Sequence, residues 1–235
     1  MAALDEGPGA PLAGARRRLS FAGVIFDLDG TLVDTLEDIA DAMDRVLALE
    51  GAPGHSYDAY RCLIGHGIRN LVAESLPPDL RDERTIARCY ERMIADYGER
   101  SLVKTRVFDG VPELVRALRA DGVLLAVHSN KADALTRDIV AALLDASDFV
   151  VVAGARPDAP LKPDPAVALA IAARFGLPPA RVAYVGDSSV DMHTAAAARM
   201  IAVGASWGFR TRQELAESGA DFVIDAPQDL LLRRA

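Results

Sequence analysis

Cysteine is nearly absent from this sequence. Only Cys62 and Cys89 occur among the 235 residues, and neither has neighbours at the spacing of metal ligands. We therefore expect two reduced thiols rather than a disulfide framework. The four histidines do not form a His-Glu-x-x-His pattern, so a zinc site is not expected either.

Positive charge is also scarce. The chain carries 26 Lys and Arg against 34 Asp and Glu, which gives a net charge of -8. General binding to nucleic acid or to an acidic membrane requires a basic surface, so neither is expected as a partner. An anionic substrate remains possible, because a bound cation can reverse the field locally.

Long hydrophobic runs are missing as well. The longest uncharged runs, such as residues 200–209, are much shorter than the roughly 20 residues of a membrane span. The stretch RRRLSFAGVIF at residues 16–26 resembles a twin-arginine export signal, but Asp27 ends its apolar part after the length of a strand. Residues 1–20, which begin rich in Ala, Gly and Pro, are interpreted as a loose tail. A cytoplasmic protein is therefore expected.

What the chain does contain is a regular alternation of short apolar runs and helical stretches. The runs are continuously apolar, as is typical of strands covered on both faces. Repeated strand-helix units predict an α/β fold, a doubly wound parallel sheet with right-handed crossovers. After the first strand at 23–26, strands are predicted at 123–127, 149–152, 182–185, 200–203 and 222–224, with helices at 132–144, 165–175, 189–199 and 211–218.

One region interrupts this alternation. Residues 36–106 contain no convincing strand and instead show helical patterns separated by Gly and Pro, at 36–50, 57–64, 67–76 and 80–97. The next helix of the core is predicted at 112–119. We therefore predict an α/β core formed by residues 21–35 and 107–235, with residues 36–106 inserted as a small helical cap domain.

Polar side chains follow the strands at the edge of the sheet where open α/β folds bind ligands. Taken singly, Ser129 and Asp187 could be helix caps, and Lys162 could be a solvated loop lysine. Asp27 and Asp29, however, directly follow an apolar strand, and carboxylates so close together repel unless a cation or a proton separates them. The candidates gathered at this edge are Asp27, Asp29, Ser129, Lys162, Asp187 and Asp191.

The same motifs carry a resemblance to a known family. DLDGT, SN, the lysine of LKPDP and GDSSVD resemble the four ordered motifs of the haloacid dehalogenase superfamily of phosphotransferases, from residue 21 onward. LIGHGIRNLV, GASWGFR and SGADFVID are most similar to phosphoglycolate phosphatases. The helical insertion just after the first motif also agrees with this superfamily.

The resemblance implies a covalent mechanism. Asp27 would attack phosphorus and form an aspartyl-phosphate, for which a carboxylate needs no activating base. Asp29 would protonate the leaving alkoxide and then activate water, so we expect its pKa to lie above that of Asp27. Lys162 would offset charge on the nucleophile and the phosphate.

The resemblance also implies a magnesium ion and a phosphate site. Mg²⁺ prefers oxygen ligands. The expected ligands are the carboxylates of Asp27 and Asp187 and the backbone carbonyl of Asp29, with Asp191 behind them or as a partial ligand. Ser129, placed at the start of a helix with its backbone N–H groups, would hold phosphoryl oxygens. Thr31 and Asn130 are further candidates for substrate contact.

The insertion is interpreted as a mobile cap that excludes water and selects the substrate. Gly65-His66-Gly67 lacks the third glycine of a dinucleotide-binding loop and follows no strand. Two alternatives remain open for this stretch: either Arg69 or His66 meets a carboxylate of the substrate, or the stretch is an ordinary helix start with a solvated arginine.

The resulting prediction is a magnesium-dependent phosphatase for a small phosphorylated metabolite, 2-phosphoglycolate first, working as a monomer or homodimer. A pyrophosphatase, a sugar-phosphate phosphatase or a β-phosphoglucomutase would use the same core. A haloacid dehalogenase proper would need neither Asp29 nor the metal. A receiver-like phospho-switch would need neither Asp29 nor the insertion, and a scaffolding role would leave the convergent acids unexplained.

Overall fold

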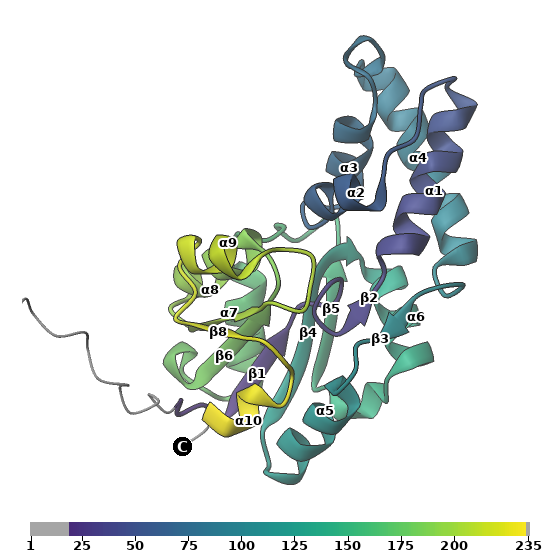
Figure 1. Cartoon of the computed structure of the whole chain (residues 1–235). Helices are drawn as coiled ribbons and strands as arrows, with labels where there is room; N and C mark the ends of the chain where they lie inside the picture. The colour runs from purple at the N-terminus through teal and green to yellow at the C-terminus, as the bar shows by residue number, and fades with distance from the viewer. Residues whose placement is uncertain (1–18, 234–235) are drawn as a thin grey trace, which may run out of the picture.

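The computed structural model describes residues 19–233, and a six-stranded parallel sheet forms its centre (Figure 1). The strand order is β5-β4-β1-β6-β7-β8, with all neighbours parallel. This confirms the predicted doubly wound α/β fold. The strands are β1 (Gly23–Phe26), β4 (Leu124–Ala132), β5 (Val151–Ala155), β6 (Val182–Gly186), β7 (Ile201–Ala205) and β8 (Phe222–Ile224).

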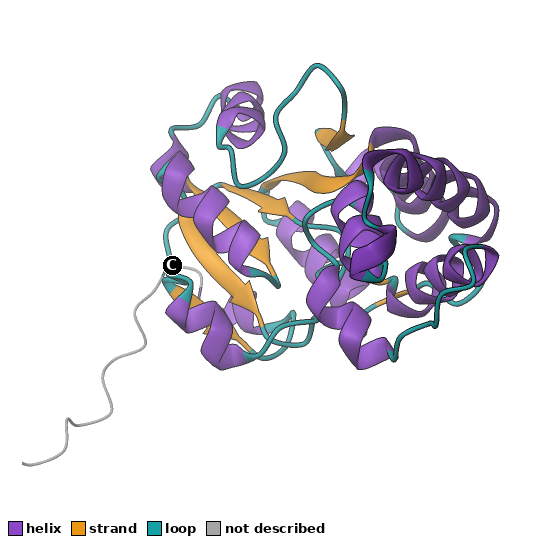
Figure 2. Ribbon diagram, turned by 90° about the horizontal axis from the view of Figure 1, so that it is seen from above, coloured by secondary structure: helices purple, strands orange, loops and turns teal. Residues whose placement is uncertain are grey.

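Helices cover both faces of the sheet (Figure 2). One face carries α5 (Val111–Ala120), α6 (Asp133–Leu143) and α10 (Asp229–Arg233). The other face carries α7 (Ala166–Phe175), α8 (Ser189–Ala198) and α9 (Arg212–Glu217). Short 3₁₀ turns lie at Ala146–Asp148 and Pro179–Arg181.

The two covered faces explain why the strands are apolar throughout. In β1, Val24 and Phe26 belong to the core under α5 and α6, whereas Ile25 belongs to the core under α7 and α8. All three side chains are buried. Because successive side chains of a strand point to opposite faces, a strand with helices on both sides has no solvent-facing position to fill with polar residues.

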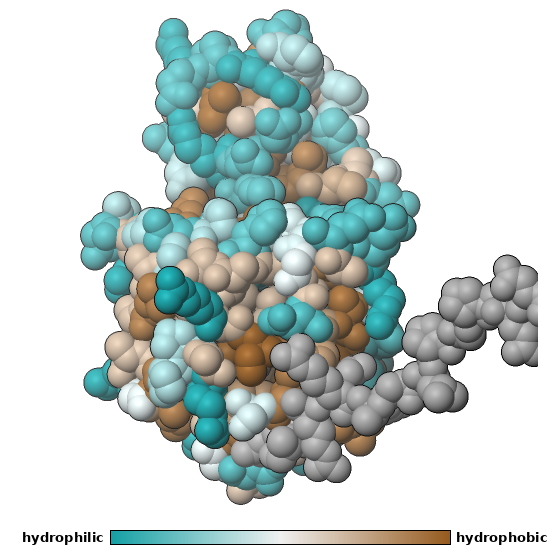
Figure 3. All heavy atoms as spheres, turned by 90° about the vertical axis from the view of Figure 1, so that its left-hand side faces the viewer, coloured by the Kyte–Doolittle hydropathy of each residue, from teal (hydrophilic) through white to brown (hydrophobic). Residues whose placement is uncertain are grey.

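The insertion forms a second, entirely helical lobe beside the carboxyl edge of the sheet (Figure 1). It consists of α1 (Leu36–Leu49), α2 (Tyr57–Leu63), α3 (Ile68–Ser75), the 3₁₀ turn Pro78–Leu80 and α4 (Glu83–Arg100). Its helices pack around their own cluster of buried apolar residues, which includes Met43, Tyr60 and Met93. Figure 3 shows the two lobes one above the other, with hydrophilic side chains predominating on the upper lobe.

The chain passes between the two lobes twice, and the two connecting segments lie side by side. Two strands of two residues each, β2 (Val33–Asp34) and β3 (Arg106–Val107), pair in antiparallel fashion at this junction. The buried carboxylate of Asp38 in α1 accepts hydrogen bonds from the backbone N–H groups of Lys104 (2.9 and 3.0 Å) and Thr105 (2.8 Å) and from the Thr105 hydroxyl (2.8 Å). A side chain just after the first connecting segment therefore binds the backbone just before the second.

A second set of hydrogen bonds joins the two lobes. Arg210, in the segment after β7, donates through its guanidinium to the carbonyl oxygens of Cys62 (3.0 Å) and Ile64 (2.9 Å) and also to that of Arg61. These carbonyls end α2, where a helix lacks internal donors and where its dipole favours a cation. The core thus caps a helix of the insertion.

The structure differs from the sequence predictions at the end of β4, at Ser129 and at Leu19. β4 does not stop at Val127, because its pairing with β5 resumes after an irregularity at Ala132↔Ala155. Ser129 therefore lies inside a strand and not at a helix start as expected. Leu19, assigned to the tail, is buried in the core and Ser20 is exposed, whereas residues 1–18, with the arginines of the export-like stretch, lie outside the described residues. Within residues 19–233, none of the helices has the length and apolarity needed to cross a membrane.

Candidate active site

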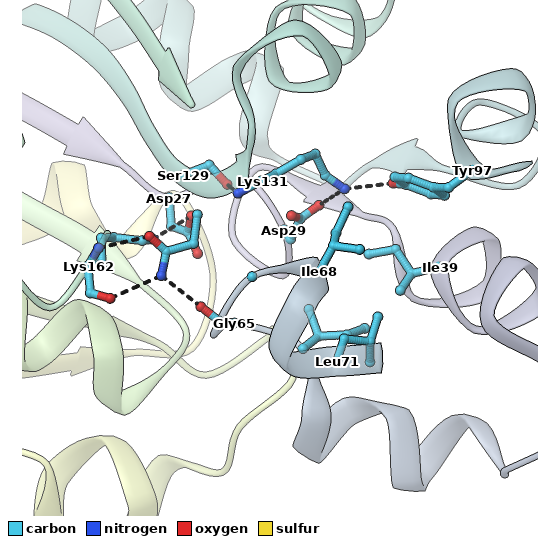
Figure 4. A pocket seen from close by; sticks show the side chains of 13 residues that line it. Asp27, Asp29, Ile39, Gly65, Ile68, Leu71, Tyr97, Ser129, Lys131 and Lys162 are labelled. Atoms are coloured by element: carbon cyan, nitrogen blue, oxygen red, sulfur yellow. Dashed lines mark hydrogen bonds and ion pairs between the residues drawn. The ribbon is translucent and has the colours of Figure 1, made fainter. Parts of the chain in front are cut away.

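Several of the predicted functional residues gather at the carboxyl edge of the sheet, and Figure 4 shows Asp27, Asp29 and Lys162 around one pocket with residues of the insertion. Asp27 directly follows β1, and Asp187 directly follows β6. Asp191 lies in the first turn of α8, and Lys162 comes from the segment between β5 and α7. All four side chains are buried. The topology therefore brings together residues that are up to 164 positions apart, taking Asp27 and Asp191 as the extremes.

Lys162 lies between two of these acids. Its Nζ is 2.7 Å from Oδ1 of Asp27 and 2.7 Å from Oδ1 of Asp191. Burial alone would lower the pKa of Lys162, but the charges of Asp191 and Asp27 outweigh it and hold the pKa well above its usual value. Lys162 is therefore an ammonium fixed beside the candidate nucleophile.

Asp27, Asp187 and Asp191 form an acidic cluster whose oxygen atoms lie within 4.8 Å of one another. Burial and the negative charge of Asp191 raise the pKa of Asp27 well above its usual value, with Lys162 acting against them. Burial and Asp191 likewise raise the pKa of Asp187 to about 7, against hydrogen bonding from Phe209. Three carboxylates that are costly to ionise together, and that offer hard oxygen donors, fit a divalent cation.

Asp187 is held in place from two sides. Its Oδ2 accepts a hydrogen bond of 2.7 Å from the backbone N–H of Phe209, and the buried Thr31 hydroxyl lies 3.5 Å from Oδ1. Gly30 packs against the same carboxylate with a φ of +83°, and a Cβ there would collide with Asp187. The glycine of DLDGT is therefore required both by its backbone conformation and by the space that Asp187 occupies.

Asp191 is engaged through both of its oxygens. Oδ1 meets Lys162, and Oδ2 accepts from the backbone N–H (3.1 Å) and the hydroxyl (2.6 Å) of Ser188 at the start of α8. The carboxylate thus caps its own helix while it faces Lys162. The place of Asp191 behind the metal ligands or as a partial ligand stays a prediction.

Asp29 turns its side chain away from the acidic cluster. Its Oδ1 lies 2.9 Å from Nζ of Lys131 and accepts a 2.7 Å hydrogen bond from the Thr35 hydroxyl. Nζ of Lys131 is also 2.6 Å from the hydroxyl of Tyr97 in α4. Burial alone would lower the pKa of Lys131, but Asp29 and Tyr97 outweigh it and raise this pKa.

Lys131 was not singled out from the sequence. It is buried, and in Figure 4 it lies on the same side of the site as Asp29 and Tyr97. Its position two residues after Ser129 would have indicated it only if the strand had been extended past Val127, since residues i and i+2 of a strand point the same way.

The predicted residues Ser129 and Asn130 both lie at the site, but they make different hydrogen bonds. The Ser129 hydroxyl accepts from the backbone N–H of Lys131 at 3.2 Å. The Asn130 amide donates to the carbonyls of Gly65 and Lys162, both at 3.1 Å, and its oxygen accepts from the Lys162 backbone at 2.8 Å. Asn130 therefore connects the core with the insertion, and substrate contact by Asn130 or Thr31 stays a prediction.

These residues surround a cavity of about 40 Å³. Its floor carries the charged side chains of the core, and its roof is an apolar wall from the insertion. The roof consists of Ile39, Ile64, Ile68 and Leu71.

His66 and Arg69 do not line this cavity. They line a larger adjoining one of about 240 Å³, together with Arg156 of the core. Arg69 is exposed and forms an ion pair with Glu83. Their role in recognising a substrate carboxylate stays a prediction.

Comparison with known proteins gives the same assignment as the motifs. Residues 24–205 match the family described as haloacid dehalogenase-like hydrolase. The chain is 36% identical over 214 residues to a phosphoglycolate phosphatase of Nitrosospira multiformis, covering 88% of this chain and 92% of that one. It is 31% identical over 211 residues to phosphoglycolate phosphatase 1 of Pseudomonas aeruginosa, covering 88% and 78%.

A solved structure of similar shape extends the comparison to the fold. The crystal structure of a predicted phosphoglycolate phosphatase from Haemophilus somnus superposes with a TM-score of 0.83 at 29% identity, covering 91% of this chain and 97% of that one. The resemblance inferred from the motifs is therefore confirmed. The chain is an enzyme that belongs to the haloacid dehalogenase-like hydrolase family.

Proposed function

We propose that this protein is a magnesium-dependent phosphatase that hydrolyses a small phosphomonoester, 2-phosphoglycolate, through an aspartyl-phosphate on Asp27. The observation that carries the proposal is the placement of Asp27 in the lining of a cavity between the core and the insertion, 2.7 Å from a buried lysine and within an acidic cluster. The names of the relatives support the substrate.

In the first half-reaction, a carboxylate oxygen of Asp27 attacks phosphorus and the bond from phosphorus to the glycolate oxygen breaks. Lys162 offsets the negative charge of the nucleophile and of the phosphoryl oxygens. A magnesium ion held by Asp27, Asp187 and the backbone carbonyl of Asp29, with Asp191 behind them, would supply further positive charge to the phosphoryl group. The ordered positive charge is the main source of rate in this scheme.

Asp29 transfers a proton in both half-reactions. It donates a proton to the departing glycolate oxygen and then takes one from the water that attacks the aspartyl-phosphate, which releases phosphate and restores Asp27. Both contacts to Asp29, from Thr35 and Lys131, fall on Oδ1. Among the described residues, Oδ2 has no such contact, which supports it as the oxygen that exchanges the proton.

The insertion would act as the cap. Its apolar roof, including Ile68 and Leu71, closes the cavity over Asp27 and displaces water that would otherwise compete for the nucleophile and weaken the electrostatic interactions.

The test is a steady-state screen of the purified protein with Mg²⁺ against a panel of phosphorylated metabolites, comparing kcat/KM. We expect 2-phosphoglycolate to rank first, many turnovers per enzyme, and loss of turnover by about 10⁴-fold or more in Asp27→Asn. Asp29→Asn should still bind Mg²⁺ but lose turnover. A single stable phosphorylation without turnover would instead support the phospho-switch, and unchanged rates after chelation would overturn the metal assignment.

A further inference from the structure

We propose that Tyr97 of the insertion is a positioning residue for the reaction: through Lys131 it fixes the carboxylate of Asp29, so that the catalytic apparatus is complete only when the insertion is seated on the core. The inference rests on the proposed role of Asp29. It concerns a residue that approaches the site from the other lobe.

The first observation is a continuous chain of polar contacts across the interface between the lobes (Figure 4). The Tyr97 hydroxyl is 2.6 Å from Nζ of Lys131, and the same Nζ is 2.9 Å from Oδ1 of Asp29. Nζ also lies 4.4 Å from the centre of the Tyr97 ring. Tyr97 therefore restrains the ammonium through both its hydroxyl and its ring.

The second observation is the burial of this chain. Tyr97 is 0% exposed and Lys131 is 4% exposed. A buried ammonium must have its charge paired and its donors satisfied, because water is not available to do so. Here the pairing charge comes from the core and the additional oxygen comes from the insertion. Lys131 would lose one of its two oxygen partners if the insertion moved away.

The third observation explains why Asp29 needs such support. The terminal torsion of an aspartate has broad preferences, so rotamer preference alone does not orient its carboxylate. The contacts to Oδ1 from Thr35 and Lys131 set that orientation. Lys131 is itself a long flexible side chain with several rotatable bonds. Removing the Tyr97 hydroxyl would release the lysine, and with it one of the two restraints on Asp29.

The expected consequence is specific to proton donation. An alkyl phosphate such as 2-phosphoglycolate needs its leaving oxygen protonated, whereas the nitrophenolate of p-nitrophenyl phosphate leaves without help. kcat/KM reports the steps up to departure of this group. We therefore expect Tyr97→Phe to lower kcat/KM about tenfold for 2-phosphoglycolate and less than threefold for p-nitrophenyl phosphate. A merely structural role would lower both alike.

A matched control exists on the same lobe. The Tyr57 hydroxyl is 3.2 Å from Nζ of Lys104, and this ammonium lies 5.7 Å from the Tyr57 ring, but the pair is exposed and lines neither cavity. Tyr57→Phe removes the same atom from a tyrosine–lysine pair, together with the 2.9 Å hydrogen bond that this hydroxyl donates to Asp41. We expect it to leave both values of kcat/KM within twofold of wild type.

A double-mutant cycle with Lys131→Met tests the route. If Tyr97 acts through Lys131, Tyr97→Phe in the Lys131→Met background should change kcat/KM less than twofold. Additive losses, or equal losses on both substrates in a variant with unchanged melting temperature, would overturn the inference while leaving the proposed function standing. Absence of phosphomonoesterase activity in the wild type would instead remove the proposed function itself.

Discussion

Lys162 and Lys131 are both buried at the carboxyl edge of the sheet, and they are held in different ways. Lys162 pairs with Asp27 and Asp191, and all three residues belong to the core. Lys131 pairs with Asp29 of the core and with Tyr97 of the insertion. The charge that acts on the phosphoryl group is therefore built into the sheet, whereas the support of the proton-transferring group is shared between the two lobes.

This difference shows how one fold can hold the catalytic charge within the core while the support of the proton-transferring group depends on the insertion. Among the described residues, the side-chain partners of Lys162 all belong to the core, so we expect the geometry of this cluster not to depend on the insertion. The shared cluster is complete only in the closed arrangement described here. Three experiments would break or sharpen this contrast.

The largest effect is expected at the core-held lysine. Lys162→Met keeps the length of the side chain but removes its charge, and we expect kcat/KM to fall by about 10³-fold, because a positioned charge in a site shielded from water contributes strongly to the transition state. Lys104→Met, at a partly exposed lysine of the insertion, should stay within twofold. A loss below threefold in Lys162→Met would make this residue a bystander.

The second effect concerns pH and the acidic cluster. The pKa of Asp187 is raised to about 7 by burial and by Asp191, so the folded protein without metal binds more protons than the unfolded chain. Its stability should therefore fall as pH rises from 6.5 to 8, by about 1 kcal/mol from this group alone, which corresponds to roughly 2–4 °C. His128 acts in the opposite direction: burial lowers its pKa to about 3 in the folded state, whereas the unfolded histidine loses its proton between pH 6.5 and 8, so it offsets this fall by about 0.4 kcal/mol.

Calorimetry with and without Mg²⁺ checks this prediction. Ion binding requires the carboxylates in their charged form, so the increase in melting temperature on adding Mg²⁺ should be larger at pH 8 than at pH 6. Asp187→Asn should remove most of this increase and flatten the metal-free profile. An equal increase at both pH values would contradict the assignment of the cluster as the ion site.

The smallest effect is expected at the periphery of the insertion. Arg69 lines the adjoining cavity and pairs with Glu83, and an exposed ion pair contributes little by itself. Arg69→Ala should lower kcat/KM for 2-phosphoglycolate about threefold and leave p-nitrophenyl phosphate unchanged if the guanidinium meets the carboxylate of the substrate. Equal changes on both substrates would exclude Arg69 from specificity.

Much of the core could be predicted from the sequence because two signals coincide there. Apolar runs that need cover on both faces mark the strands, and polar residues directly after them mark the binding edge of the sheet. Asp27, Lys162, Asp187 and Asp191 were placed at this edge, and the structure brings them together.

The rest could not be predicted because it depends on how the lobes meet. The Lys131–Tyr97 contact joins residues 34 positions apart on different lobes, and periodicity carries no information about it. The two-residue strands β2 and β3 are too short for any alternation to mark them. The location of His66 and Arg69 depends on how the insertion is turned, which ties such as the Arg210 guanidinium help to set.

The junction at Asp38 has a consequence for how this protein can diversify. Both crossings of the chain emerge at one root, where β2 pairs with β3 and a single carboxylate binds the returning backbone. Helices beyond this root can be lengthened, exchanged or redesigned without altering the order or the register of the strands beneath. New substrate preferences could thus arise by changing a module whose chain joins the core at one root, provided that a group equivalent to Tyr97 still reaches Lys131.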